Sequence, residues 1–353
     1  MMTGSNASRG IGTKGALAAL SALAVAGLAI AQKPDMPLPA DEQPRVSFSL
    51  LGVFEYQFDS DFNEGGSYQV SRYLAGMSAQ TLLLEDLKMT IGLGYELDSY
   101  DFDTGDSEFS RVADVLSMPE MMPLGANQVP DRDDPVPAGL SIDPNPWDDI
   151  HIINFGAVFS KPLDDHWTIF GGPVFQLAFE SGAEIGDSFI GGALIGASYR
   201  FNDDLTLGAG FGGVSQIEDS ERYFPVILVD WKIIDGLRLS NQGPTGAGGR
   251  NGIELTYSVT DRIQLGIGGA YEYRRFRLDD DEDEIAPDGV GFEERTPIWL
   301  RAGYQFNDNC SVSLYGGIAW ETQIQIEDSQ GQKVVDDEGD NTPFVAATLS
   351  YRF

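Results

Sequence analysis

The last segment of the chain, residues 343–353, alternates strictly between two kinds of side chain. Every second position is apolar, and the segment closes on an aromatic residue: Val345, Ala347, Leu349, Tyr351 and Phe353. Because successive side chains of a β-strand point to opposite faces, this period of two predicts a strand with one apolar face. Such a strand must place that face against a core, a second sheet or lipid.

The same alternation recurs along most of the chain. Residues 87–98 show it most clearly, with apolar side chains at every odd position from Leu87 to Leu97. Gly (42 residues) and aromatic residues (11%) are abundant, as expected of many short strands in a tight wall. We predict an all-β fold with about fourteen strands, twelve being the next count. The segments are 46–58, 68–80, 87–98, 149–160, 166–180, 188–201, 205–216, 222–233, 236–241, 251–259, 263–274, 295–306, 310–326 and 343–353.

The connections between these segments separate two architectures that share the alternation. A soluble sandwich would turn its apolar faces inward, whereas a membrane barrel turns them toward lipid. Short turns rich in Asn and Asp, such as 201–204 and 306–309, alternate here with longer polar loops. Short turns on one rim and long loops on the other are typical of outer-membrane barrels. The sequence therefore predicts a transmembrane antiparallel up-and-down β-barrel over residues 46–353, with both termini on the periplasmic side.

The N-terminal region carries the pattern of a secretory signal. Arg9 and Lys14 precede an apolar, Ala-rich run over 16–31 that is shorter than the about 20 residues of a membrane-spanning helix. We expect residues 1–31 to be a cleaved signal peptide. Residues 32–45, which are rich in proline, are expected to form a periplasmic arm. The predicted localisation is the outer membrane of a diderm bacterium.

The chain end resembles the terminal strand of bacterial outer-membrane barrels. The resemblance implies that Tyr351 and Phe353 belong to the signal read by the barrel-insertion machinery, which becomes an expected partner together with outer-membrane lipid. Aromatic residues flank other predicted turns in the same way, and we expect them to form a girdle at the periplasmic interface. These residues are Tyr199, Phe201, Tyr257, Tyr304 and Phe306.

From about residue 147 to the end, the chain also resembles a family of functionally uncharacterised bacterial outer-membrane β-barrel proteins. The stretches that carry this resemblance are 170–173 (FGGP), 196–201 (GASYRF), 224–231 (FPVILVDW), 273–279 (YRRFRLD) and 298–301 (IWLR). The resemblance implies the barrel fold. It brings no ligand, catalytic residue or transport substrate with it.

Acidic residues dominate the predicted loops. The chain has 55 acidic and 22 basic residues and a net charge of −33, which argues against nucleic acid as a partner. Three long acidic loops are predicted, at 103–146, 279–294 and 327–342, and residues 107–116 have the spacing of a short amphipathic helix.

Asp101, Asp103 and Asp106 resemble a fragment of a calcium loop that lacks the distal glutamate. They are weak metal candidates, because charge for solubility and for repulsion at the rim is the preferred explanation. No cofactor is predicted beyond loosely bound divalent cations at the acidic loops.

Charged residues at the inward-facing positions of the predicted strands are the main candidates for function. They would either line a water-filled pore and set its ion preference, or form salt bridges across a closed lumen. The sequence does not decide between these alternatives. The lumen-facing candidates are Lys88, Glu96, Glu180, Arg200, Asp230, Lys232, Arg238, Glu254, Glu272, Arg274, Arg301, Glu321 and Arg352.

Three classes of function remain open at this point. The first is a passive pore or transporter for an unknown small solute or ion, because fourteen strands enclose more space than side chains fill in an eight-stranded barrel. The second is a closed structural or surface-binding barrel that acts through its acidic loops. A membrane-embedded hydrolase is a distant third, since no arrangement singles out a serine beside His151 or His166, the two histidines. We therefore predict no enzyme, and a Ser–His contact on the wall would favour the third class.

Overall fold

A computed structural model of the chain describes residues 46–84, 86–105, 107–116, 143–241, 252–281 and 284–353. Several predictions fall outside these residues. They are the signal peptide (1–31), the periplasmic arm (32–45), residues 117–142 of the longest loop, and the metal candidate Asp106.

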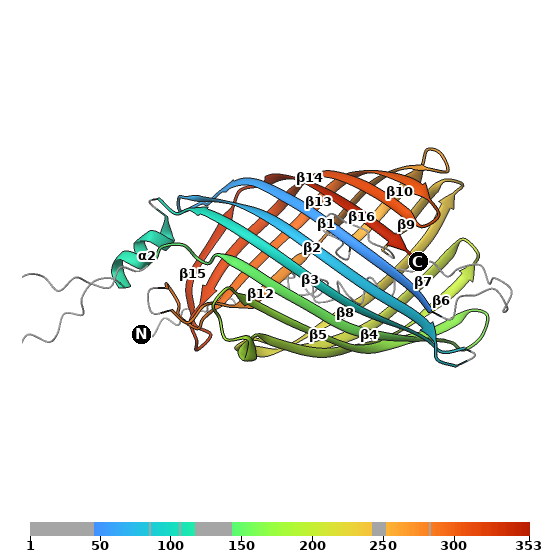
Figure 1. The fold of residues 1–353 in the computed structure, drawn as a ribbon, viewed down its shortest axis with the longest axis horizontal. Helices are drawn as coiled ribbons and strands as arrows, with labels where there is room; N and C mark the ends of the chain where they lie inside the picture. Colours follow the sequence, from blue (N-terminus) through green and yellow to red (C-terminus); the bar gives the residue numbers. More distant parts are fainter. Residues whose placement is uncertain (1–45, 85, 106, 117–142, 242–251, 282–283) are drawn as a thin grey trace, which may run out of the picture.

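The strands form one antiparallel sheet that closes on itself (Figure 1). Helix α2 (Glu108–Leu116) and the 3₁₀ turn η3 (Ile185–Ser188) lie in connections. The strand segments are β1 (Val46–Asp61), β2 (Ser67–Leu82), β3 (Lys88–Asp103), β4 (Asp149–Pro162), β5 (Trp167–Glu180), β6 (Phe189–Asn202), β7 (Leu205–Gln216), β8 (Asp219–Ile234), β9 (Leu237–Ser240), β10 (Gly252–Ser258), β11 (Ile263–Ala270), β12 (Glu272–Arg277), β13 (Val290–Asn307), β14 (Cys310–Glu327), β15 (Lys333–Gly339) and β16 (Thr342–Arg352).

These segments make a barrel of fourteen strands. β11 and β12 are two parts of one strand, interrupted at Tyr271, and both pair with β13. β15 and β16 are likewise separated by Asp340 and Asn341, and both pair with β14. The ring closes where β16 pairs with β1, so the predicted fourteen-stranded antiparallel barrel is confirmed.

The alternation of side chains gives the barrel an apolar outer face. On β3, Leu93 and Tyr95 point outward and are more than two-fifths exposed, whereas the residues that follow each of them, Gly94 and Glu96, are buried. Large apolar side chains are exposed in the same way on every long strand, as expected of a surface in contact with lipid. Among the described residues, no helix combines the length and the apolar character needed to cross a membrane.

The two ends of the barrel differ. At one end, here called the turn end, short connections such as 203–204, 235–236 and 308–309 join the strands, and the chain finishes there (Figure 1). Three Tyr–Phe pairs from equivalent positions meet edge to face at this end: Tyr199–Phe201, Tyr304–Phe306 and Tyr351–Phe353, with ring centroids 4.8 to 5.0 Å apart. The opposite end, called the loop end, carries α2, β15 and the connection 278–289.

At the loop end, β12, which continues β11, approaches β5. Arg277 at the end of β12 pairs with Phe179 of β5, although β6 to β10 lie between these strands in the sheet order. On the other side, Phe62 after β1 pairs with Gly339 of β15. Strands β1 to β5 and β12 to β15 therefore close a smaller ring at the loop end, and β6 to β10 stand outside it.

Two segments predicted as acidic loop contribute strands to this smaller ring. β13 begins at Val290, inside the predicted loop 279–294, and β15 lies within the predicted loop 327–342. Two of their acidic side chains, Glu293 of β13 and Asp337 of β15, are buried in the structure instead of facing solvent. The acidic composition of these two segments suggested loops, because composition carries no information about which residues pair in the fold.

Candidate functional site

A group of charged side chains fills the smaller ring near the loop end. We call it the ionic cluster, and every member is 5% exposed or less. β1, β2 and β3 supply one side of the cluster, and β12 and β13 supply the other. Its members are Glu55, Arg72, Glu96, Asp98, Glu272, Arg274, Glu293 and Arg295.

Arg72 and Glu293 form the central pair of the ionic cluster. Both terminal oxygens of Glu293 accept hydrogen bonds from Nη2 of Arg72, at 2.6 and 2.8 Å. The Tyr100 hydroxyl donates a further bond to Oε2 of Glu293, at 2.9 Å. Since β1, β16 and β14 lie between β2 and β13 in the sheet order, this pair spans the lumen.

The two other arginines extend the network on both sides. Arg274 contacts Glu293 at 2.8 Å and Asp98 at 3.0 Å. Arg295 contacts Glu55 at 2.5 Å and Glu272 at 2.7 Å. Removing one partner of a buried ion pair leaves an uncompensated charge, so the cluster acts as one unit. Its cross-lumen bonds fill the opening that the smaller ring encloses.

An apolar cluster covers the ionic cluster on the loop-end side. Trp147 packs edge to face on Phe276 at 4.9 Å, and Phe109 of α2 packs on Phe62 at 5.4 Å. All four side chains are buried, although they lie where a porin-like barrel would open to water. The segment that the sequence predicted as an amphipathic helix thus places its apolar face in the mouth of the barrel.

Charged pairs nearer the turn end lie along the wall. Arg301 of β13 donates to Glu254 of β10 at 2.8 to 3.1 Å, across the intervening strand β11. Gly266 of β11 makes this possible, because a Cβ at that position would meet the Glu254 carboxylate at 2.8 Å. Arg238 pairs with Asp230 on the adjacent strand. These pairs join neighbouring strands and do not cross the lumen.

The remaining lumen-facing candidates lie near the two rims. Arg200, Lys232 and Arg352 are exposed at the turn end, where Lys232 pairs with Asp235 at 2.6 Å, and Lys88 is half-buried there. Glu180 is buried at the loop end, where it accepts hydrogen bonds from two backbone N–H groups, those of Asp148 and Asp279.

Glu321 departs from the predicted position. Its backbone has a positive φ of 50°, and the register between β13 and β14 shifts at this point. Ala319 is buried before the shift and Thr322 after it, so the inward parity changes and the side chain of Glu321 is exposed. The alternation of apolar residues in the sequence does not reveal a β-bulge of this kind, so the predicted inward position of Glu321 was wrong.

Sequence reasoning missed five of the eight members of the ionic cluster. The parity rule would have included Glu55, Arg72 and Asp98, because each lies on a predicted strand. Glu293 was hidden in a predicted acidic loop, and Arg295 stood at the edge of a predicted strand. What the sequence does not carry is the crossing of β12 toward β5, which brings these side chains together.

A serine and a histidine meet on the outer wall near the loop end. Nε2 of His151 lies 2.9 Å from Oγ of Ser181, and Nδ1 lies 2.8 Å from the Tyr95 hydroxyl. His151 and Tyr95 have the outward parity of their strands, so the contact faces the surroundings of the barrel. His166 lies in a turn at the opposite end, where Nδ1 bonds the backbone oxygen of Arg200.

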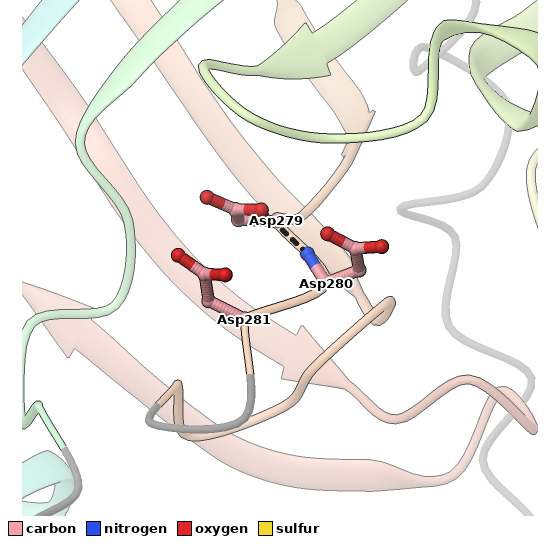
Figure 2. Close-up of side chains that lie close together, drawn as sticks. All are labelled: Asp279, Asp280 and Asp281. Carbon is pink, nitrogen blue, oxygen red and sulfur yellow. Dashed lines mark hydrogen bonds between the residues drawn. The ribbon is translucent and has the colours of Figure 1, made fainter.

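Three consecutive carboxylates gather in the connection after β12. Figure 2 shows Asp279, Asp280 and Asp281, each of which offers an oxygen within 4.8 Å of the others. Burial, followed by the neighbouring carboxylates, raises the pKa of Asp279. Ca²⁺ takes about six to eight oxygen ligands, so this trio alone is not a complete site.

The weak metal candidates on β3 do not join this trio. Asp101 accepts a hydrogen bond from Gln69 at 2.7 Å, and Asp103 ends the strand. Of the described residues, only the trio after β12 brings three potential ligands together.

A closed antiparallel sheet with an apolar outer face and charged residues inside defines a transmembrane β-barrel of the outer-membrane type. Residues 145–352 match the family described as domain of unknown function (DUF6268). This match spans more than half of the sequence, so the chain belongs to that family and the predicted resemblance is confirmed. A comparison with curated protein sequences finds no match.

Solved structures of outer-membrane barrels resemble the chain at low identity. An outer membrane channel from Pseudomonas putida F1 is 8% identical, with 90% of this chain and 100% of that chain covered and a TM-score of 0.40. The toluene transporter TodX of Pseudomonas putida is 11% identical, with 95% and 98% covered and a TM-score of 0.39. The translocator domain of the autotransporter NalP from Neisseria meningitidis is 11% identical, with 89% and 90% covered and a TM-score of 0.34. These similarities are too weak to carry an argument about function.

Proposed function

We propose that this protein is an outer-membrane transporter of small solutes whose loop end is closed to ions in the conformation described. The observation that carries the proposal is the contrast in how charged side chains lie. They cross the lumen in the ionic cluster, whereas Arg301 and Glu254 lie flat along the wall toward the turn end. A barrel with a purely structural role has no need of this difference between its two ends.

The short connections and the Tyr–Phe pairs of the turn end support an orientation with that end in the periplasm. With the turn end in the periplasm, the Tyr–Phe pairs lie at the periplasmic interface and the acidic loop end faces the exterior. The closed loop end then separates the lumen from the medium. Outer-membrane lipid and the insertion machinery are the partners that this placement requires, and Tyr351 and Phe353 remain the proposed insertion signal.

The experiment combines conductance with uptake. The refolded protein in a planar bilayer is expected to show no steady ionic current, because charged side chains pair across the lumen at the loop end. Cells that carry the protein should nevertheless take up at least one small probe faster than cells without it. The panel holds nitrocefin, a polar probe cleaved in the periplasm, and N-phenyl-1-naphthylamine, an apolar probe that fluoresces in phospholipid.

The results separate the candidate functions. A steady current would contradict the closure and indicate a diffusion pore. Uptake of both probes at the background rate would contradict transport and favour the closed structural or surface-binding barrel, which acts through its acidic loops. Arg238→Gln, which alters only a pair on the wall, should behave like the wild type in both assays.

The contact between His151 and Ser181 favours a second candidate function, ester hydrolysis at the membrane surface. A nucleophile and a base within hydrogen-bond reach, with a third group to orient the base, form the minimal arrangement for acyl transfer. Tyr95 fills the third position with a phenol, which is a weaker partner for an imidazolium than a carboxylate. The proposed roles are nucleophile for Ser181 and general base for His151.

Hydrolysis of a p-nitrophenyl ester in detergent micelles tests this second function. Ser181→Ala should abolish turnover, whereas His166→Gln, which changes the histidine at the other end, should leave it intact. Absence of turnover in the wild-type protein, or its persistence in Ser181→Ala, would exclude a hydrolase built on this contact.

A further inference from the structure

The contact between His151 and Ser181 lies where an apolar part of the outer wall meets a polar rim. Strands β3, β4 and β5 are consecutive neighbours, and their register sets the outward side chains in rows across the three strands. Toward the loop end, three rows that are apolar apart from His151 are followed by a polar row, and no member of any row is buried. The rows are Leu93, Phe155 and Phe175; Tyr95, Ile153 and Leu177; Leu97, His151 and Phe179; and then Ser99, Asp149 and Ser181.

Two aromatic rings hold the imidazole of His151 at this boundary. Tyr95 of β3 stacks on it with ring centroids 6.1 Å apart, and Phe179 of β5 lies against it at 5.4 Å. The Tyr95 hydroxyl lies 2.8 Å from Nδ1 of His151, and Oγ of Ser181 lies 2.9 Å from Nε2. When Nδ1 carries the proton, it donates to the Tyr95 oxygen and leaves the lone pair of Nε2 directed at the serine hydroxyl. A base held in this way can accept the proton of the nucleophile.

The level of this boundary matches the level of an ester bond in a membrane lipid. Outward apolar side chains of a transmembrane barrel meet hydrocarbon, and aromatic residues mark the level of the head groups. The ester of a glycerolipid joins the acyl chain to the head-group region, so it occupies that same level. An acyl chain that lies against exposed Leu93, Phe155 and Phe175 therefore brings its carbonyl carbon toward Ser181.

The polar rim beside the contact is acidic. Asp148 and Asp149 precede His151 in the chain, and Glu184 follows Ser181 by three residues. None of these three carboxylate side chains is buried. Carboxylates attract an ammonium group and repel phosphate groups. The rim thus favours a zwitterionic head group that ends in an ammonium over a head group that carries only phosphates.

Resting on the second function proposed above, ester hydrolysis, we propose that this contact cleaves the acyl ester of a zwitterionic phospholipid in the outer leaflet. Oγ of Ser181 forms a bond to the ester carbonyl carbon, and its proton passes to Nε2 of His151. The bond between that carbon and the alcohol oxygen of the lipid breaks, and the alcohol leaves with the proton from Nε2. Water then attacks the acyl-serine with the same base, which releases a fatty acid and restores the serine hydroxyl.

The experiment measures the release of fatty acid from vesicles. The refolded protein is reconstituted into vesicles of dioleoyl phosphatidylethanolamine and dioleoyl phosphatidylcholine, and released oleate is quantified by mass spectrometry. A second arm adds lipopolysaccharide, whose head group carries phosphates, and a third arm supplies p-nitrophenyl acetate, a short soluble ester. Ser181→Ala tests the nucleophile and Phe155→Ser tests the surface for the acyl chain. Phe211→Ser is the matched control, because Phe211 is an exposed outward residue of β7, which β5 and β6 separate from β4.

The wild-type protein is expected to release oleate, and Ser181→Ala should lower the rate to that of vesicles without protein. Phe155→Ser should lower the initial rate severalfold, whereas Phe211→Ser should leave it unchanged. Equal rates in these two phenylalanine variants would overturn the path of the acyl chain. Release of acyl chains from lipopolysaccharide alone would overturn the zwitterionic head group.

The soluble ester separates the substrate from the reaction. Cleavage of p-nitrophenyl acetate that depends on Ser181, without any release of oleate, would overturn the lipid substrate while ester hydrolysis itself stands. If the wild-type protein cleaves none of the three substrates, the hydrolase function fails, and the lipid substrate fails with it.

Discussion

Charged side chains point into the barrel at both the loop end and the turn end, but they pair across the lumen at the first and along the wall at the second. At the loop end, Arg72 reaches Glu293 across the lumen, and the ring is closed by side chains. Toward the turn end, Arg301 reaches Glu254 across a single strand and remains on the wall. Inward charges therefore do not by themselves define either a pore or a plug. The number of strands in the ring at that height, and the glycines beside each charge, decide which one forms.

Glycine accounts for the flat wall toward the turn end. Gly266 and Gly268 of β11 leave room for Glu254 and for the ring of Trp299, which would otherwise point into the lumen. Trp299 donates to Glu254 at 2.9 Å and is almost completely buried. At the loop end, the smaller ring brings opposite walls close enough for direct contact.

The largest effect is expected from Arg295→Met in the ionic cluster. The substitution keeps an unbranched apolar stem but removes the closest cation from buried Glu55 and Glu272, which are left with the more distant Arg72 and Arg274. Breaking a buried pair in this way costs about 3–5 kcal/mol. The free energy of unfolding of the barrel in lipid vesicles, measured by denaturant titration, reports the loss.

Arg238→Met is the matched control for that substitution. Its partner Asp230 is only part-buried and the pair lies on the wall, so the cost should stay within about 1 kcal/mol. Equal losses of unfolding free energy in the two variants would contradict the distinction between a cluster that closes the lumen and pairs that lie along the wall.

A smaller effect is expected from Gly268→Ala on β11. The new Cβ would lie 2.6 Å from the ring of Trp299 and 2.8 Å from the backbone oxygen of Ile253. Overpacking of this kind costs about 1–3 kcal/mol and would displace Trp299 from Glu254. Gly52→Ala is the control, because a Cβ there meets nothing within 4 Å. Similar denaturant midpoints for both variants would show that the wall does not depend on these glycines.

The fold was predictable from the sequence and the ionic cluster was not. Period-two alternation depends on neighbouring residues alone, so it revealed fourteen strands and the turn end with its Tyr–Phe pairs. Contact between Arg72 and Glu293 depends on the path of β12 toward β5, which no local pattern records. The acidic segment that contains Glu293 also resembled a loop in composition. The bulge at Glu321 shows the remaining weakness, since one extra residue reverses the parity of everything that follows.

The smallest effect concerns acidification, which should act oppositely on the two ends. Backbone N–H groups of Trp167 and His166 bond the Asp164 carboxylate in a turn and hold its pKa below the ordinary value of 3.8. That turn is therefore stabilised above pH 3.8 and loosens as the pH falls through the lowered pKa. Burial raises the pKa of Asp279 at the loop end, so its ionised form is disfavoured there. The connection 278–281 should then tighten as the pH falls from about 7 toward about 4, because protonation removes the penalty.

Hydrogen exchange measured by mass spectrometry, corrected for the intrinsic effect of pH, compares the two segments in one sample. Between about pH 7 and about pH 4, the segment 278–281 should gain protection while 163–167 stays unchanged, since both unfolded carboxyls remain largely ionised in most of that window. Asp279→Asn should remove the change at the loop end, and Asp164→Asn should loosen the turn at every pH. If both segments responded to acid with the same sign, the two carboxyls would share one environment, and the electrostatic contrast between the buried loop end and the solvated turn end would be lost.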